Sequence, residues 1–183
     1  MNDLITKIKS TDDKIRGPAW QNAGPLGAPA VKDLAGVMAD PDFEIARSAR
    51  RALWKIVRYA GRPGAEKEAA AVTAAIIPLL SSGTTIVRRE LLWMLSEIGR
   101  DQAVAPIASL LMNADLREDA RCCLERTPGR QSLAALKRAF SAAAEEFKYA
   151  LAESLRARGE PVHGYPSRKL VPRKSTRVQP LGA

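Results

Sequence analysis

The stretch VRRELLWMLSEIGR, residues 87–100, decides the fold, because its pattern recurs four more times along the chain. The other copies begin at Ile15 (IRGPAWQNAG), Ile45 (IARSARRALWKI), Leu116 (LREDARCCLER) and Phe147 (FKYALAESLR). Each copy opens on a large apolar residue and has small or apolar residues four and eight places later. These positions share one face of an α-helix, so the segments are predicted to be five copies of one amphipathic helix.

The spacing of these helices predicts the architecture. The starts at 15, 45, 87, 116 and 147 are 30, 42, 29 and 31 residues apart, and a near-constant period in this range is typical of a solenoid. A less regular apolar segment precedes each copy. We therefore predict an all-α, right-handed α-solenoid of about five helix pairs over residues 1–158, with units at about 1–24, 25–60, 61–100, 101–127 and 128–158.

Bulk composition narrows the class of protein. Of the 183 residues, 46% are hydrophobic but only 5% are aromatic, which favours helices over a β-rich fold. The longest apolar runs are too short to span a membrane, and MNDLITKIKSTDD lacks the apolar core of a signal peptide. The two cysteines, Cys122 and Cys123, are adjacent and form no disulfide framework. These features predict a cytoplasmic protein and leave its oligomeric state open.

The net charge of +9 permits an acidic partner: nucleic acid, an acidic protein surface or an anionic membrane surface. The segment 159–183 is rich in Pro and Gly, has no apolar period, and is predicted to form an extended tail. It contributes a net +4, and the body of the chain keeps +5. The tail cations expected to contact a partner are Arg168, Lys169, Arg173, Lys174 and Arg177.

A second basic surface is predicted on the helices of units two and three. Stepping 100° per residue from the opening apolar residue places offsets 2, 6, 9 and 13 opposite the core. These offsets carry Arg47, Arg51, Trp54 and Arg58 in unit two, and Arg89, Trp93, Ser96 and Arg100 in unit three. Trp and Arg are enriched in binding hot spots, so we predict a contact surface. The alternative is that each Trp packs on a neighbouring helix while the arginines are solvated.

Other polar residues have simpler structural interpretations. Basic residues one place after the opening apolar residue are expected to bond carboxylates of the turns, such as Asp13 and Asp115, and they comprise Arg16, Arg88, Arg117 and Lys148. Cys123 is expected in the core and Cys122 at the surface. Nothing orients His163, the only histidine. The sequence shows no catalytic set, metal-binding spacing or cofactor motif, so it predicts no enzyme and no cofactor.

The repeat resembles the HEAT-like repeats of phycobilisome-lyase-type bacterial proteins. AVAPIASLLMNADLREDARCCL shows the form, with an apolar first helix, Asp in the turn, then apolar-Arg-x-x-Ala. Unit two departs from it at Ala46 and unit five at Phe147 and Lys148. The residues that carry the resemblance are Asp13, Ile15, Arg16, Ala19, Val87, Arg88, Leu91, Asp115, Leu116, Arg117 and Ala120. The resemblance implies that second helices line a concave surface and that the array is a protein-binding scaffold.

The preferred function is therefore a non-catalytic scaffold or accessory subunit that binds an acidic protein through this basic, Trp-bearing face and the tail. The alternative is a module that binds nucleic-acid phosphates. DNA-glycosylase members of the HEAT-like group place Trp and Arg on their concave face, but Glu90 and Glu97 are expected to point sideways, which leaves no carboxylate beside the tryptophans. That activity and a bilin-lyase-like role are therefore disfavoured.

Overall fold

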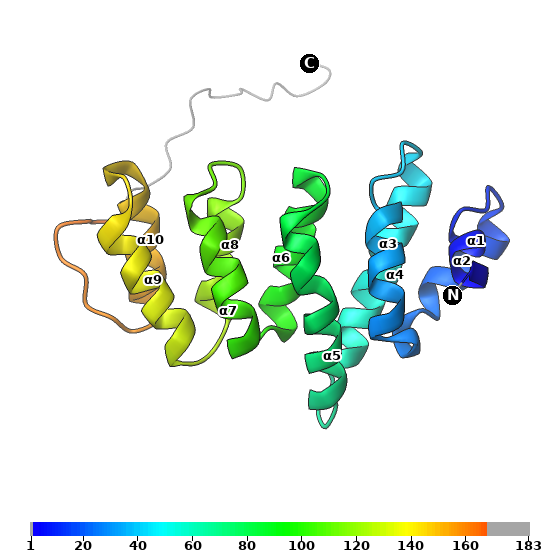
Figure 1. The fold of residues 1–183 in the computed structure, drawn as a ribbon, viewed down its shortest axis with the longest axis horizontal. Helices are drawn as coiled ribbons and strands as arrows, with labels where there is room; N and C mark the ends of the chain where they lie inside the picture. Colours follow the sequence, from blue (N-terminus) through cyan, green and yellow to red (C-terminus); the bar gives the residue numbers. More distant parts are fainter. Residues whose placement is uncertain (1, 168–183) are drawn as a thin grey trace, which may run out of the picture.

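The structure is a computed structural model that describes residues 2–167, and this part of the chain consists of helices and connecting turns (Figure 1). The α-helices are α1 (Asn2–Ile8), α2 (Asp13–Gln21), α3 (Val31–Val37), α4 (Phe43–Ala60), α5 (Glu66–Ile76), α6 (Thr85–Ile98), α7 (Asp101–Ala108), α8 (Arg117–Arg126), α9 (Arg130–Ala142) and α10 (Glu145–Ala157). Short 3-10 segments accompany them, namely η1 (Gly24–Leu26), η2 (Ala28–Ala30), η3 (Ile77–Ser81) and η4 (Ser109–Met112). The all-α prediction is confirmed for these residues.

The helices form pairs that follow one another in a row (Figure 1). Within each pair an odd-numbered helix contacts the even-numbered helix after it. The even-numbered helices α2, α4, α6, α8 and α10 also contact each other in succession, and so do the odd-numbered helices. Two layers result, and the five amphipathic segments found in the sequence all lie in the even-numbered layer.

Local signals place the helix ends. Asp42 caps α4 by accepting hydrogen bonds from two backbone N–H groups of the first turn, at 2.8 and 3.1 Å. Thr84 caps α6 in the same way, and Gly83 before it has φ +86°, a left-handed conformation that favours glycine. Pro78 lacks the backbone N–H that an α-helix needs, and the helix α5 changes to 3-10 geometry at Ile77. Pro18, in contrast, lies inside the continuous helix α2.

One continuous apolar core fills the space between the two layers, from Ile8 to Leu155. The positions four and eight residues after each opening residue supply much of it, and the buried ones are Ala23, Ala49, Leu53, Leu91, Leu95, Ala120, Leu124, Leu151 and Leu155. Among the opening residues, Val87, Leu116 and Phe147 are also buried, whereas Ile15 has 47% of its surface exposed. It lies at the first pair, where no earlier pair covers it within the described residues.

The beginning of the predicted tail differs from expectation. Residues 159–167 pack against the last helix pair rather than extending freely. The ring of Tyr165 meets Phe140 and Tyr149 edge to face, with both centroid distances 5.2 Å. Val162 packs against the core, and the hydroxyl of Ser167 donates to Glu153 on α10. These aromatic and polar contacts hold the start of the tail against the last helix pair, and the tail cations from Arg168 onward lie outside the described residues.

Arg158 joins the last two pairs through backbone carbonyls. Its guanidinium donates to the carbonyl oxygens of Leu124 at 3.1 Å, Thr127 at 2.8 Å and Gly129 at 2.9 Å. It also donates to the hydroxyl of Ser132 at 3.1 Å. A single cation therefore satisfies the carbonyl end of α8 and the turn into α9, which would otherwise lack donors.

We expect Arg158→Ala to lower the free energy of unfolding by about 2 kcal/mol, because it leaves several half-buried carbonyls without a donor. Urea denaturation followed by circular dichroism measures this change. Arg138→Ala is the matched control: Arg138 is exposed on α9, has no hydrogen bond within residues 2–167, and its removal should change stability by less than about 0.5 kcal/mol. Equal effects of both substitutions would contradict the role given to Arg158.

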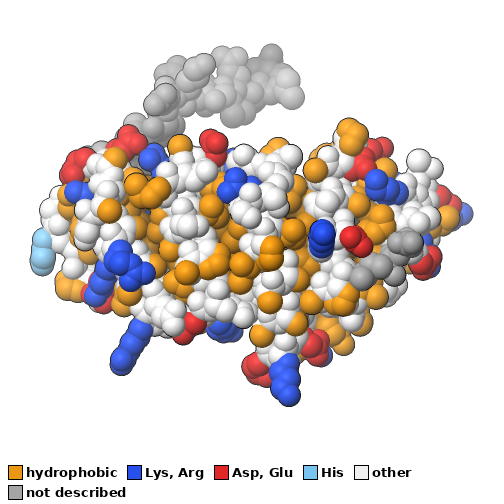
Figure 2. Space-filling view, in the orientation of Figure 1, with side chains coloured by type: hydrophobic (Ala, Val, Ile, Leu, Met, Phe, Trp, Pro, Cys, Tyr) orange, Lys and Arg blue, Asp and Glu red, His pale blue; other side chains and the backbone are white. Residues whose placement is uncertain are grey.

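The odd-numbered layer faces the viewer in Figures 1 and 2. The middle of this face is largely hydrophobic or uncharged, and the charged side chains in view lie mainly toward its margins (Figure 2). Among the described residues, no helix combines the length and the apolar character needed to cross a bilayer. The basic surface predicted from the sequence belongs to the other layer.

Candidate functional site

A hollow of about 580 Å³ lies on the even-numbered layer, between α2, α4 and α6. Its cations all come from α4, at positions that the helical repeat places on one face. Trp20 enters it from α2 and Glu90 from α6. We call this site the α4 hollow, and its lining residues are Trp20, Arg50, Arg51, Trp54, Lys55, Arg58 and Glu90.

Two arginines of the α4 hollow are held against tryptophan rings. The guanidinium carbon of Arg51 lies 5.1 Å from the centre of the Trp20 ring, and that of Arg58 lies 5.1 Å from the Trp54 ring. Cation–π contacts of this kind contribute about 0.5–1 kcal/mol at exposed sites. The rings therefore orient the two guanidinium groups without neutralising their charge.

Carboxylates compensate only part of the positive charge of the α4 hollow, because its lining contains four cations and one acidic residue, Glu90. Arg50, Arg51, Lys55 and Arg58 form no ion pair with any residue in the described part of the chain. Arg50 and Arg58, the first and last of these cations, lie eight positions apart on α4, or about 12 Å along its axis. Most cations on the later even-numbered helices differ, because carboxylates pair with Arg89, Arg117, Arg121, Lys148 and Arg156. Among the described residues of this layer, α4 carries four cations without an ion pair, whereas α2, α6 and α8 carry one each, namely Lys14, Arg88 and Arg126.

Each of two tryptophans donates its indole N–H to a carboxylate on the next even-numbered helix. Trp54 Nε1 lies 2.5 Å from Oε1 of Glu90, and Trp93 Nε1 lies 3.0 Å from Oδ1 of Asp119. Both acceptors stand three places after the opening apolar residue of their helix. The expectation that no carboxylate lies beside the tryptophans was therefore wrong, because an acidic side chain that points sideways meets the long Trp side chain of its neighbour.

The remaining predicted site residues on α4 and α6 do not line the α4 hollow. Arg47 is half-buried, pairs with Glu44 at 2.5 Å and stacks on Phe43. Arg89 pairs with Asp119 at 3.3 Å and is therefore neutralised within the fold.

Trp93 retains 41% exposure beside the Arg89–Asp119 pair. Arg100 follows the end of α6 and lines a different cavity. Ser96, at the remaining outward offset, is buried. Of the eight residues predicted for this surface, only Arg51, Trp54 and Arg58 therefore come together in the α4 hollow.

The arginines one place after the opening residue have structural contacts, as expected, but not always the expected ones. Arg16 bonds Asp13 and also donates to the carbonyl of Ser10 at 2.9 Å. Arg88 donates to the carbonyl of Leu80 at 2.6 Å instead of a turn carboxylate. In each case a cation supplies a donor to the carboxyl end of the preceding helix, where carbonyls are exposed.

The described residues offer little for catalysis. No cluster of three or more His, Cys, Asp or Glu side chains there could hold a metal ion. Burial raises the pKa of the Cys123 thiol to about 12 and, as the largest of several causes, also raises the pKa of half-buried Cys122. A raised pKa keeps the thiol protonated, so neither cysteine is an activated nucleophile.

Thiol reactivity tests this assignment. At pH 8 in the native protein, we expect an aromatic disulfide reagent to modify Cys122 slowly and Cys123 not at all, because the reactive species is the thiolate. In urea both thiols should react rapidly. The Cys123→Ser variant should react as the unaltered protein does under native conditions, and in urea it should consume one equivalent less of the reagent. A fast reaction of Cys123 in the native protein would show that it is not in the core.

Sequence reasoning missed Trp20, Arg50, Lys55 and Glu90 in the α4 hollow. A projection of one helix cannot identify them, because their roles depend on which side chains of the neighbouring helices they contact.

No protein-family model matches the chain, and no significant match was found among curated proteins.

Proposed function

We propose that the protein is a non-catalytic interaction scaffold, built as a right-handed α-solenoid of five HEAT-like helix pairs, that binds an acidic protein partner. The α4 hollow is the main contact, and the basic residues after Ser167 are the second. The two helix layers in a row support the architecture, because an array of this kind offers one long surface per layer.

The uncompensated charge on α4 carries this proposal. Four cations within about 12 Å of one helix create a local positive potential that neighbouring carboxylates do not cancel. Such a cluster repels itself in the free protein, so a bound anion relieves that repulsion as well as gaining charge-assisted hydrogen bonds. An acidic protein segment would supply the carboxylates that these four cations lack.

The tryptophans make this surface suited to a protein partner. Trp54 is fixed by its bond to Glu90, and Trp20 is covered on one side by Arg51. Rigid aromatic rings with adjacent Arg side chains lose little conformational entropy on binding, which is why these residue types dominate interface hot spots. The hollow thus combines an apolar wall with fixed cationic donors.

The tail cations support a second contact on the same layer. Ser167 is the last described residue, and it bonds Glu153 on the even-numbered helix α10. The basic residues that follow it therefore start from the layer that carries the α4 hollow. A partner long enough to bind both surfaces would gain affinity, because the second contact would form within the same complex.

The placement of carboxylates favours a short acidic protein segment over a nucleic acid. Glu90 lies in the hollow itself, and Glu118, Asp119 and Glu153 lie on α8 and α10 of the same layer. A long polyanion that crossed several helices would approach these carboxylates, whereas an acidic segment confined to α4 would avoid most of them.

Nucleic-acid binding remains the second candidate, supported by the two Arg–Trp stacks, since Trp and Arg planes also stack on bases. Glu90 beside Trp54 removes the reason for which a DNA-glycosylase-like activity was disfavoured. The described residues show no reaction centre for that activity. The exposed His163 gives no support to a bilin-lyase-like role.

Fluorescence anisotropy decides between the two partner classes. We expect a labelled glutamate-rich peptide to bind more tightly than single-stranded or duplex DNA at physiological ionic strength, and truncation after Ser167 to weaken peptide binding. Steep loss of DNA affinity with added salt would indicate contacts to phosphates. DNA binding that is tighter than peptide binding at physiological salt would overturn the protein-partner proposal.

A further inference from the structure

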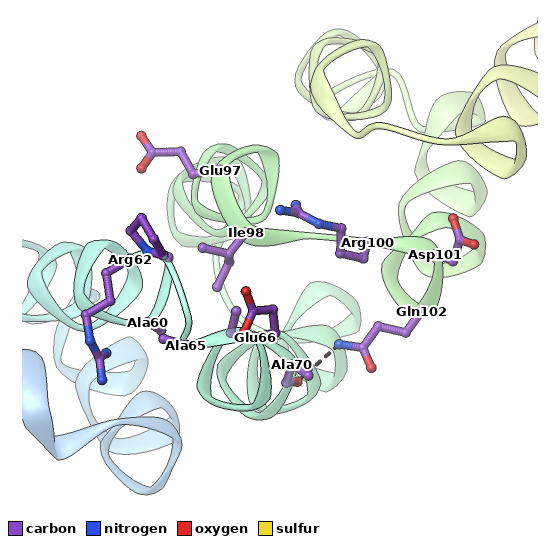
Figure 3. Close-up of a pocket in the computed structure, with 13 residues that line it drawn as sticks. Ala60, Arg62, Ala65, Glu66, Ala70, Glu97, Ile98, Arg100, Asp101 and Gln102 are labelled. Carbon is purple, nitrogen blue, oxygen red and sulfur yellow. Dashed lines mark hydrogen bonds between the residues drawn. The ribbon is translucent and has the colours of Figure 1, made fainter.

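A second cavity, of about 510 Å³, opens where α4 and α6 end and where α5 and α7 begin (Figure 3). Its volume falls in the range of small-molecule sites. Gln102 Nε2 donates to the carbonyl of Ala70 at 3.1 Å, which ties α7 to α5 at one side of the cavity. Small apolar residues form much of the remaining wall, among them Ala60, Ala65, Ala69 and Ile98.

Two of the charged residues on this wall are already engaged. Both terminal nitrogens of Arg62 donate to the carboxylate of Glu68, each at 2.7 Å. This pairing lowers the pKa of Glu68, with the hydrogen bond from Arg62 as the largest cause. Asp101 accepts a hydrogen bond from Gln131 at 3.2 Å. The charge of Arg62 is therefore neutralised by Glu68, whereas Asp101 keeps its negative charge and has the amide of Gln131 as its hydrogen-bond partner.

Glu66 and Arg100 carry opposite charges, form no ion pair within residues 2–167 and face the cavity. Glu66, in the first turn of α5, has no hydrogen bond or ion pair within residues 2–167. Arg100 donates to the carbonyl of Gly99 at 2.8 Å and forms no ion pair there. Figure 3 shows both side chains directed toward the space beside Ile98, while Glu97 points away from it. The cavity thus presents one anion and one cation with apolar surface between them.

We propose that this cavity binds a small zwitterion of about dipeptide size, with its amine at Glu66 and its carboxylate at Arg100. The apolar middle of the ligand lies against the alanines and Ile98. A ligand with a single charge would pair with one of these residues and leave the other unpaired. A zwitterion satisfies both charges, and its apolar middle fits the apolar surface between them.

The test is a nuclear magnetic resonance titration of isotope-labelled protein with alanyl-leucine. We expect saturable shifts of the backbone amides of Gly99, Arg100 and Gln102. Acetylation of the peptide amine, or amidation of its carboxylate, should each weaken binding about tenfold or more, since each removes one charge-assisted hydrogen bond. In Glu66→Gln, the free peptide amine should no longer bind better than the acetylated amine, while the preference for the free carboxylate should remain. In Arg100→Gln, the free carboxylate should no longer bind better than the amide, while the preference for the free amine should remain.

Lys67→Gln is the matched control, because Lys67 neighbours Glu66 on α5 but does not line the cavity. It should bind alanyl-leucine as the unaltered protein does. Equal affinities for free and blocked peptides, or no saturable shift up to the solubility limit of the peptide, would overturn the proposal. An Arg51→Glu/Arg58→Glu variant should retain dipeptide binding, so the outcome is independent of the function proposed for the α4 hollow.

Discussion

An Arg51→Glu/Arg58→Glu variant is expected to bind a glutamate-rich peptide about a hundredfold more weakly than the unaltered protein. Each arginine is oriented by a tryptophan ring and lacks a carboxylate partner in the described part of the chain. Each reversal removes a charge-assisted hydrogen bond worth about 1.5–3 kcal/mol, and 1.4 kcal/mol corresponds to a tenfold change in affinity. Fluorescence anisotropy with labelled peptide gives the ratio of dissociation constants.

The matched control reverses two other cations. Arg130 and Arg138 are exposed on α9, in the odd-numbered layer, and form no ion pair within residues 2–167. Arg130→Glu/Arg138→Glu makes the same change in net charge as the α4 variant. It should reduce peptide affinity only slightly, through long-range electrostatics that salt screens. Equal losses in both variants would show that binding follows total charge and not the α4 hollow.

Leu91→Ala is expected to produce the largest loss of stability, about 3–4 kcal/mol. Leu91 lies on α6 with no exposed surface, and its helix contacts both α4 and α8 in the centre of the row. The substitution leaves a cavity that neighbours on two sides cannot close. Urea denaturation should show a lower midpoint with an unchanged slope.

Ile86→Ala, on the same helix, is its control. Ile86 has 77% of its surface exposed, so its truncation should change the free energy of unfolding by less than about 0.5 kcal/mol. A large effect at Ile86 together with a small one at Leu91 would mean that α6 buries a different face from the one described.

Much of the helical fold could be predicted from the sequence, because one apolar spacing is repeated. The amphipathic segment 87–100, for example, lies almost entirely within the observed helix Thr85–Ile98. The packing of residues 159–167 could not be predicted, because it depends on Tyr165 reaching two rings on α9 and α10. Contacts of that kind leave no periodic pattern.

The candidate site was predictable in part. Projection of α4 alone identifies Arg51, Trp54 and Arg58, since outward positions follow from the helical repeat. It does not show that Arg89 is neutralised by Asp119, nor that Glu90 accepts the indole N–H of Trp54. Those contacts depend on the distance and rotation between neighbouring helices, which a single helix does not encode.

The indole N–H resonances of the three tryptophans test directly whether an acidic peptide binds at the α4 hollow. Trp20 and Trp54 line the α4 hollow, whereas Trp93 lies beside Asp119 on the α6–α8 side. Single Trp→Phe variants assign the three signals. On titration with a glutamate-rich peptide, we expect the Trp20 and Trp54 signals to shift together while the Trp93 signal stays in place. A shift of Trp93 alone, or of none of the three at saturating peptide, would contradict binding at the α4 hollow.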